Sequence, residues 1–304
     1  MRSPPNTRPI SSPNWRKGVE VPKAAATHSI ADALAWARQR IATVDARVLL
    51  RHVLNCSSAR LVTQGEEVLE STARDRFEAL VKRRAGGEPV AYLVGEREFY
   101  GRMFKITPAV LIPRPETELL VELALARCVD RRQPRLLDLG TGSGILAITL
   151  ALELPDACVC AVDCSREALW VAMANAAGAG ASVSFVESDW FAGLGSERFD
   201  LIVANPPYVA AADPHLDEGD VRFEPRSALA AGPEGLDDLD WIIVQAPTYL
   251  EPSGWLLMEH GYDQAAAVRS RLLDAGFVDV TSWQDLAGIE RVTGGRRLRP
   301  SAQA

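Results

Sequence analysis

Several features are scarce in this chain of 304 residues, and each scarcity disfavours a class of protein. No apolar run approaches the ~18 residues of a membrane-spanning helix, and the N-terminus lacks the apolar segment of a secretory signal. Basic residues are outnumbered 33 to 40, which gives a net charge of −7. That balance disfavours a protein devoted to duplex nucleic acid, although a local basic patch remains compatible with it. We therefore expect a cytoplasmic monomer that neither contacts a membrane nor binds DNA directly.

Cysteine and histidine are also sparse, with five and four residues. An odd number of cysteines without a signal peptide fits free thiols in the cytosol. Cys158 and Cys160 lie in an apolar run that is typical of a strand, and the histidines are scattered without the spacing of metal ligands. No metal site is expected.

The length favours two domains, and composition indicates where they lie. Residues 1–27 are rich in proline and polar side chains, which predicts a disordered tail. Apolar residues recur at helical spacing in residues 28–90, which predicts a small helical bundle. It could serve as a packing or a recognition module, and we expect substrate recognition. Residues 91–117 form a predicted β-hairpin connector, residues 118–297 a predicted α/β domain and residues 298–304 a second tail.

A glycine-rich loop at residues 140–144 follows a predicted strand and precedes a predicted helix. This arrangement is typical of the first βα unit of a Rossmann-like sheet. Asp138 stands just before the loop, where a carboxylate would repel a pyrophosphate but would suit a cationic ligand. S-adenosylmethionine carries an ammonium, a sulfonium and no phosphate, so it fits this loop better than a dinucleotide.

The next two predicted strands also end in polar residues. Asp163 follows the second strand at roughly the 20-residue offset of an acid that binds a ribose. Asp189 and Trp190 follow the third, where the carboxylate can accept from an adenine amino group and the indole can cover the ring. The alternative for Trp190 is a plain core side chain.

The fourth predicted strand ends in Asn-Pro-Pro-Tyr, residues 205–208, which we call the clamp loop. The prolines stop the strand and stiffen the loop. The side-chain oxygen of Asn205 and the carbonyl of Pro206 can accept both N–H groups of a planar amino group, and Tyr208 can stack on it. The alternative is an ordinary loop after a strand that prolines terminate. Together with the cofactor residues, the clamp loop predicts in-line methyl transfer to a planar nitrogen.

Arg114 lies between two prolines, so it is held in an extended segment that presents its guanidinium. It could contact substrate or cofactor, or form a surface salt bridge.

Further motifs at residues 97–99, 111–118, 224–229, 232–236, 259–261 and 290–292 add to these. With them, residues 28–297 resemble the HemK/PrmC family of protein-(glutamine-N5) methyltransferases. The resemblance implies a seven-stranded, Rossmann-like class I S-adenosylmethionine-dependent domain after a small helical domain. It implies methylation of the glutamine in the Gly-Gly-Gln motif of peptide chain release factors, with S-adenosylhomocysteine as the other product.

The resemblance also implies residue roles. The cofactor residues would be Gly140, Thr141, Gly142, Ser143, Gly144, Asp163, Trp190 and Asn205, beside Asp189 from the strand pattern. The substrate glutamine would be held by Asn205, Pro206, Pro207 and Tyr208, with Phe99 and Arg114 flanking it; Asn205, Pro206 and Tyr208 are the predicted catalytic residues. Alternatives are a ribosomal large-subunit protein as substrate, an amino methyltransferase of nucleic acid, and a cofactor-binding protein without activity. One departure from the family is Pro247, which should kink or interrupt a helix near residues 236–250.

Overall fold

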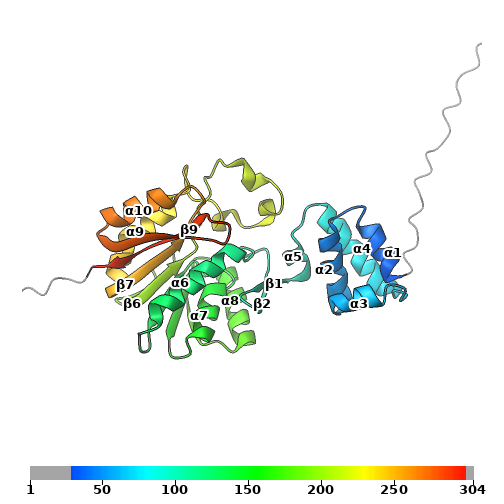
Figure 1. Ribbon diagram of the computed structural model, residues 1–304, viewed down its shortest axis with the longest axis horizontal. Coiled ribbons are helices and arrows are strands. Elements are labelled where there is room, and N and C mark those ends of the chain that lie inside the picture. The colour runs from blue at the N-terminus through cyan, green and yellow to red at the C-terminus, as the bar shows by residue number, and fades with distance from the viewer. Residues whose placement is uncertain (1–28, 299–304) are drawn as a thin grey trace, which may run out of the picture. The chain divides into compact units, whose positions relative to one another are not determined.

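The computed structural model describes residues 29–298 (Figure 1). The tail predicted for residues 1–27 and nearly all of the tail predicted for residues 298–304 lie outside that range. The chain divides into two compact units, residues 1–78 and 79–304, with the boundary inside one helix. Within the described residues, no helix is long and apolar enough to cross a bilayer, and no group of three His, Cys, Asp or Glu side chains could hold a metal ion.

The first unit is helical. Helices α1 (Ile30–Ala37), α2 (Thr43–Leu54) and α3 (Ser58–Thr63) precede α4 (Ser71–Ala85), which crosses the boundary between the units. Ser29 caps α1, because its hydroxyl accepts from the backbone N–H of Asp32 at 3.1 Å. The short helix α3 was not predicted.

After the end of α4, the second unit continues with the short helix α5 (Val90–Val94), also not predicted, and a hairpin. Strands β1 (Glu96–Phe99) and β2 (Arg102–Lys105) pair antiparallel, which confirms the predicted hairpin. Its two turn residues, Tyr100 and Gly101, both have positive φ, 51° and 72°. Positive φ at both central positions matches the twist of the flanking strands. The 3-10 helix η1 (Pro115–Thr117) then leads into α6 (Glu118–Cys128).

A seven-stranded sheet forms the centre of the second unit. Its strands are β3 (Arg135–Leu139), β4 (Cys158–Asp163), β5 (Val183–Glu187), β6 (Phe199–Ala204), β7 (Leu250–Glu259), β8 (Phe277–Gln284) and β9 (Glu290–Arg297). Their spatial order is β5-β4-β3-β6-β7-β9-β8, and β9 runs antiparallel to both neighbours. This confirms the expected seven-stranded sheet. The last strand lies between β7 and β8, so β8 forms the edge.

Helices cover both faces of the sheet (Figure 1). The helices α6, α7 (Ile145–Glu153) and α8 (Arg166–Ala179) cover one face, and α9 (Asp237–Tyr249) and α10 (Ala265–Asp274) cover the other. Each face has its own apolar cluster, one around Leu136 and Ile148, the other around Ile202 and Ile243. Pro247 does not interrupt α9. It lies in the last turn, and only Thr248 and Tyr249 follow it in the helix.

The strand order places the site. It reverses at β3, whose neighbours are β4 and β6, and ligands of open α/β sheets bind outside the carboxyl ends of the strands at such a point. Leu139 at the end of β3 is in register with Ala204 at the end of β6. The glycine-rich loop and the clamp loop therefore begin side by side. Between β6 and α9 the chain also forms the 3-10 helices η2 (Pro214–Asp217), η3 (Val221–Phe223) and η4 (Arg226–Ala228).

Candidate functional site

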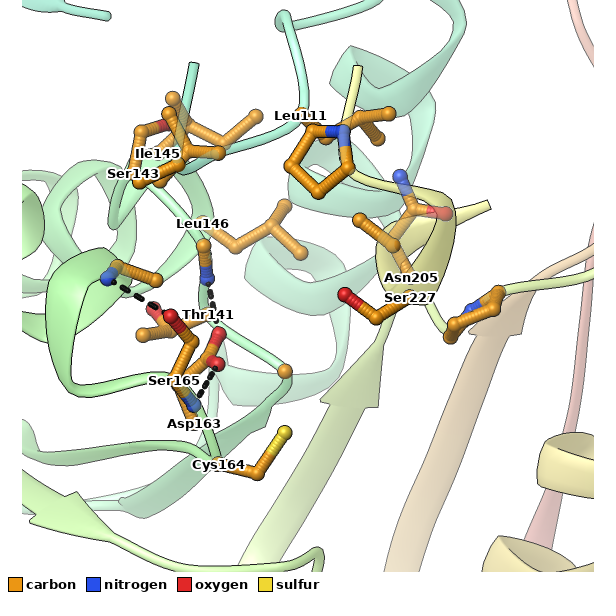
Figure 2. A pocket seen from close by; sticks show the side chains of 18 of the residues that line it. Leu111, Thr141, Ser143, Ile145, Leu146, Asp163, Cys164, Ser165, Asn205 and Ser227 are labelled. Atoms are coloured by element: carbon orange, nitrogen blue, oxygen red, sulfur yellow. Dashed lines mark hydrogen bonds between the residues drawn. The ribbon is translucent and has the colours of Figure 1, made fainter. Parts of the chain in front are cut away.

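A cavity of about 500 Å³ lies at these strand ends, and we call it the large cavity. Its volume is within the ~300–1,000 Å³ of small-molecule sites. Thr141, Asp163 and Cys164 lie on one side of it and Asn205 and Ser227 on the other (Figure 2). The predicted residues among its lining are Arg114, Gly140, Thr141, Gly142, Ser143, Asp163, Asp189, Trp190, Asn205 and Pro207. The structure thus brings together every predicted cofactor residue except Gly144.

Two glycines of the loop, Gly142 and Gly144, have different structural roles. A Cβ on Gly142 would meet no heavy atom within 4 Å, so its backbone is open to the cavity, and its φ of 55° suits glycine. A Cβ on Gly144 would lie 2.8 Å from Ile148 Cδ1 and 3.1 Å from Ala172 Cβ. Gly144 therefore permits close packing of α7 on α8 and does not line the cavity.

Asp163 braces the glycine-rich loop. Its Oδ2 accepts from the backbone N–H of Gly142 at 2.8 Å, and its Oδ1 accepts from that of Ser165 at 2.8 Å (Figure 2). Burial raises the pKa of this carboxyl, and the two backbone N–H groups oppose that rise. The carboxylate thus joins the end of β4 to the loop that follows β3. Its predicted contact with a ribose stays a prediction.

Asp138 lies beneath the loop and does not line the cavity, although the sequence suggested a ligand contact there. It is 1% exposed, and its Oδ2 accepts from the Thr141 hydroxyl at 2.6 Å and from the Ala147 N–H at 3.2 Å. Burial raises the pKa of Asp138 to about 7. Its role in the structure is to hold the loop against the start of α7.

Trp190 covers the far side of the loop. It adopts a positive φ of 47°, and a Cβ on Gly140 would lie 3.3 Å from its Cζ3. Asp238 also lines the large cavity; burial raises the pKa of its carboxyl, and hydrogen bonding with the Trp190 side chain lowers it. The sequence did not identify Asp238 as a site residue. It is one of several acidic residues in the first turn of α9, and acidic residues at a helix start are expected for helix stability alone.

A second, small cavity of about 190 Å³ adjoins the first. Apolar side chains dominate its lining, and it shares Leu111, Arg114, Asn205 and Ala228 with the large cavity. Pro206 and Tyr208 face the small cavity, whereas Pro207 lines the large one. Asn205 therefore lies where the two cavities meet.

Among the described residues, only one of the two polar atoms of the Asn205 amide has a hydrogen-bond partner. Its Nδ2 donates to the hydroxyl of Thr117 at 3.3 Å. Its Oδ1 is buried and has no hydrogen-bond partner among residues 29–298. A buried acceptor without a partner costs about 1–3 kcal/mol, so the site is built to receive a donor from outside the chain.

The other end of the clamp loop is firmly held. The Tyr208 backbone N–H donates to the Leu229 carbonyl at 3.1 Å, and its carbonyl accepts from Gln264 Nε2 at 3.0 Å. The Tyr208 hydroxyl donates to Glu259 Oε1 at 3.2 Å. Burial, followed by the nearby Glu259 carboxyl, raises the pKa of Tyr208, so the phenol stays protonated.

The two predicted flanking residues differ in their placement. Arg114 lines both cavities and also forms an ion pair with Glu224, a buried carboxylate whose Oε2 accepts from the Ile112 N–H at 2.9 Å. Phe99 is 1% exposed, packs edge-on against Phe104 and lines neither cavity. That placement does not match the flanking role expected for Phe99, because the hairpin folds its ring into the core.

The charges of the large cavity fit S-adenosylmethionine. Four carboxylates line it, and the one cation among its lining residues, Arg114, is already paired with Glu224. Such a wall has no free cation for a pyrophosphate but suits an ammonium and a sulfonium. The residues that would hold this cofactor are the open loop backbone, Asp163, Asp189 and Trp190.

Two buried residues that support the clamp loop were also missed as site residues. Thr117 and Glu259 contact its two ends, Thr117 at Asn205 and Glu259 at Tyr208. Glu259 could have been identified from the sequence, because it is a carboxylate at the end of an apolar strand, which is the pattern that identified Asp163. Thr117 is one polar residue in a helix start and carried none.

Comparisons with known proteins agree with this architecture. Residues 17–95 match the family model described as PrmC N-terminal domain, and residues 116–219 match the Methyltransferase small domain. The chain is 54% identical over 260 residues to the release factor glutamine methyltransferase of Burkholderia pseudomallei, covering 83% of this chain and 91% of the relative. It is 52% identical over 264 residues to that of Xylella fastidiosa, covering 86% and 96%. A solved methyltransferase from Pyrococcus furiosus has the same fold at 15% identity, with a TM-score of 0.51 over 73% of this chain and 98% of that one. The chain therefore belongs to the family of release factor glutamine methyltransferases.

Proposed function

We propose that this protein is an S-adenosylmethionine-dependent methyltransferase that methylates the side-chain amide nitrogen of a glutamine in peptide chain release factors, within their Gly-Gly-Gln motif. The observation that carries the proposal is the buried Oδ1 of Asn205, which lacks a partner at the junction of the two cavities. The large cavity would hold the cofactor, and the small one the glutamine side chain. Asn205 would meet both.

The chemistry requires that a poor nucleophile be oriented. An amide nitrogen attacks weakly, because its lone pair is delocalised into the carbonyl. Asn205 Oδ1 and the Pro206 carbonyl would accept the two N–H groups of the substrate amide, and the Tyr208 ring would pack against its plane. These acceptors stabilise the nitrogen more strongly as it becomes positive, so no strong base is needed before attack, and the methylated nitrogen would then lose one proton to water. When bound, S-adenosylmethionine supplies an electrophilic methyl group on its sulfonium sulfur.

The remaining cofactor roles belong to the walls of the large cavity. Asp163 would accept from a ribose hydroxyl, Asp189 from the adenine amino group, and Trp190 would cover the adenine ring. Residues 140–144 would approach the cofactor with their backbone, which the open position of Gly142 supports.

The proposal also assigns a role to each part of the chain. Residues 28–90 would recognise the release factor, residues 91–117 would connect them to the catalytic domain, and the protein would act as a monomer. It would work in the cytoplasm, because release factors act there on ribosomes. The net charge of −7 supports a protein substrate over DNA.

Transfer of labelled methyl from S-adenosylmethionine tests the proposal. The acceptors are a purified release factor, a ribosomal large-subunit protein and duplex DNA, and mass spectrometry locates the label. We expect label on the glutamine of Gly-Gly-Gln, and none on a release factor in which that glutamine is replaced by glutamate. Label only on the ribosomal protein would overturn the substrate, and label only on DNA would overturn the substrate class.

A further inference from the structure

Two motifs of the sequence lie outside both cavities, Gly-Pro-Glu-Gly-Leu at residues 232–236 and Glu-His-Gly at residues 259–261. Both are joined by one buried side chain, the amide of Gln264. This residue is 8% exposed and stands directly before α10. Its amide also contacts the clamp loop, so it links these motifs to the proposed site.

The side chain of Gln264 makes four hydrogen bonds. Its Oε1 accepts from the backbone N–H of Gly261 at 2.8 Å. Its Nε2 donates to three backbone carbonyls, those of Tyr208 at 3.0 Å, Gly235 at 3.2 Å and Glu234 at 3.3 Å. The two hydrogens of Nε2 are thus shared among three acceptors, and both polar atoms of the amide have partners.

These partners fix the orientation of the Gln264 amide. The Gly261 N–H can only donate, and the three carbonyls can only accept. Turning the amide over would set Nε2 against the N–H and Oε1 against the carbonyls, which would lose all four hydrogen bonds in a buried place. Gln264 therefore presents a donor to the Tyr208 carbonyl and cannot present an acceptor.

The prolines of the clamp loop make such a contact important. Pro206 and Pro207 have no N–H, so neither can anchor the loop by donating a hydrogen bond. The next residue is Tyr208, whose N–H donates to the Leu229 carbonyl at 3.1 Å and whose carbonyl accepts from Gln264. Both backbone polar groups of Tyr208 are thus held, two residues after the carbonyl of Pro206 that would accept from the substrate amide.

The side chain of Tyr208 has an anchor of a different kind. Its hydroxyl donates to Glu259 Oε1 at 3.2 Å, and burial raises the pKa of Glu259 to about 7. The charge of that carboxyl therefore changes near neutral pH, whereas the amide of Gln264 stays neutral. The hold of Gln264 on the clamp loop does not depend on pH.

Gly235 confines the same backbone carbonyl. A Cβ on Gly235 would lie 2.8 Å from the carbonyl carbon of Tyr208 and closer still to its oxygen. Only glycine permits so close an approach, and the φ of 72° at this position also suits glycine. The position of the Tyr208 carbonyl is thus set by packing against Gly235 and by the hydrogen bond from Gln264.

We propose that Gln264 is a positioning residue that fixes the C-terminal end of the clamp loop, and with it the Pro206 carbonyl and the Tyr208 ring, for the substrate amide. Gln264 lines neither cavity, so it acts through the clamp loop and not by touching cofactor or substrate. The inference rests on the proposed function. It adds the group through which residues 232–236 and 259–261 support the reaction.

The variant Gln264→Glu tests the donor end of the amide alone. It keeps an oxygen for the Gly261 N–H and replaces the NH2 group by a second oxygen, which would face three carbonyls. With the full chain and a saturating release factor, we expect kcat to fall at least ~10-fold while the Kd for S-adenosylmethionine, measured by calorimetry, stays within about 2-fold. A kcat within about 2-fold of wild type, or a cofactor Kd that weakens in parallel with kcat, would overturn the proposal.

Gln245 supplies the matched control for the added charge. It is a half-buried residue of α9 that lines neither cavity. Gln245→Glu makes the same change from amide to carboxyl and should keep kcat within about 2-fold of wild type. A loss as large as that of Gln264→Glu would show that charge alone lowers kcat, and the proposal would fall.

A pair of glycine variants tests the Tyr208 carbonyl while leaving the amide intact. Gly232 and Gly235 both have positive φ, 64° and 72°, so alanine is strained at each. A Cβ on Gly232 would meet the side-chain carboxylate of Asp237, which can rotate away, whereas a Cβ on Gly235 would displace the Tyr208 carbonyl. We expect Gly235→Ala to lose at least ~10-fold in kcat and Gly232→Ala to stay within about 3-fold of wild type. Equal losses in the two variants would contradict the proposal.

The controls separate this inference from the proposed function. Circular dichroism melting of each variant shows whether it folds, and the glycine pair carries the test if Gln264→Glu does not fold. If the wild-type protein fails to label the release factor, the proposed function fails. If the wild type is active and Gln264→Glu and Gly235→Ala match it, only the positioning role fails.

Discussion

Arg114 forms an ion pair with Glu224, so a residue presented by two prolines is fixed by a carboxylate from the segment between β6 and α9. The Glu224 side chain is fully buried, whereas that of Arg114 is 32% exposed. Removing the arginine therefore leaves a buried charge, while removing the glutamate leaves a partly hydrated one.

The first prediction follows from this asymmetry. Arg114→Ala should lower the free energy of unfolding by about 2–4 kcal/mol, because it leaves the Glu224 carboxylate buried without its cation. Glu224→Ala should lower the free energy of unfolding less through the loss of the ion pair, but it should also leave the Ile112 N–H without its acceptor. Urea unfolding of both single variants and the double variant gives the coupling, and a double variant whose loss equals the sum of the two would argue against a direct pair.

The clamp loop gives the second prediction. Asn205→Ala removes the unpartnered acceptor, so kcat should fall about 100-fold or more, a loss near 3 kcal/mol of barrier. Binding of S-adenosylmethionine should weaken by less than about 3-fold, because most of the cofactor residues belong to other strand ends. Single-turnover methyl transfer and calorimetry measure the two quantities. Turnover within about 3-fold of wild type would show that Asn205 does not hold the substrate amide.

The third prediction contrasts two glycines of the same loop. Gly142→Ala puts a methyl group into the open cavity, so cofactor affinity should fall, and the strain of its positive φ should also cost roughly 1–2 kcal/mol of stability. Gly144→Ala drives a methyl group to within 2.8 Å of Ile148, so it should lower the free energy of unfolding by roughly 1–3 kcal/mol in the absence of any ligand. Urea unfolding and cofactor titration of the pair distinguish them. Similar profiles for both variants would contradict the two separate roles.

The fourth prediction concerns pH. The pKa of Asp138 is about 7 in the fold and about 3.9 in an unfolded chain, so the folded state binds this proton more tightly. Its contribution to stability is fully present below pH ~4 and is lost as pH rises through about 7, a change on the order of 2–4 kcal/mol. Asp138→Asn should therefore show a flatter dependence of unfolding free energy between pH 5 and 8 than the wild type. Glu259 remains in both proteins, so the difference between the curves isolates Asp138, and parallel curves would refute the assignment.

The sequence predicted those features that depend on local pattern. Asp163 and Asn205 could be placed because each directly follows a buried strand, and the parallel order of such strands brings their ends to one edge. Gly142 was placed by the spacing of the glycine-rich loop.

Features that depend on distant partners could not be predicted. The side chain of an aromatic residue in a hairpin, such as Phe99, can point into the core or into a cavity. Which of the two occurs depends on the elements that pack against the hairpin, and the strand pattern gives no information about them. Glu224 and Thr117 lie within the motifs at residues 224–229 and 111–118, but the residues they contact are far along the chain, so the local pattern does not reveal their roles. The position of β9 inside the sheet is likewise a matter of topology, since its sequence would suit an edge strand equally well.

That position has a consequence for how the protein is made. β9 is synthesised after both β7 and β8, yet it supplies the hydrogen-bonding partner on one side of each of them. Until residues 290–297 emerge, β7 keeps an open edge and β8 has no strand to pair with, although β7 carries Glu259 under the clamp loop. Completion of the sheet around β7, and with it the support of the clamp loop, therefore waits until β9 has been synthesised.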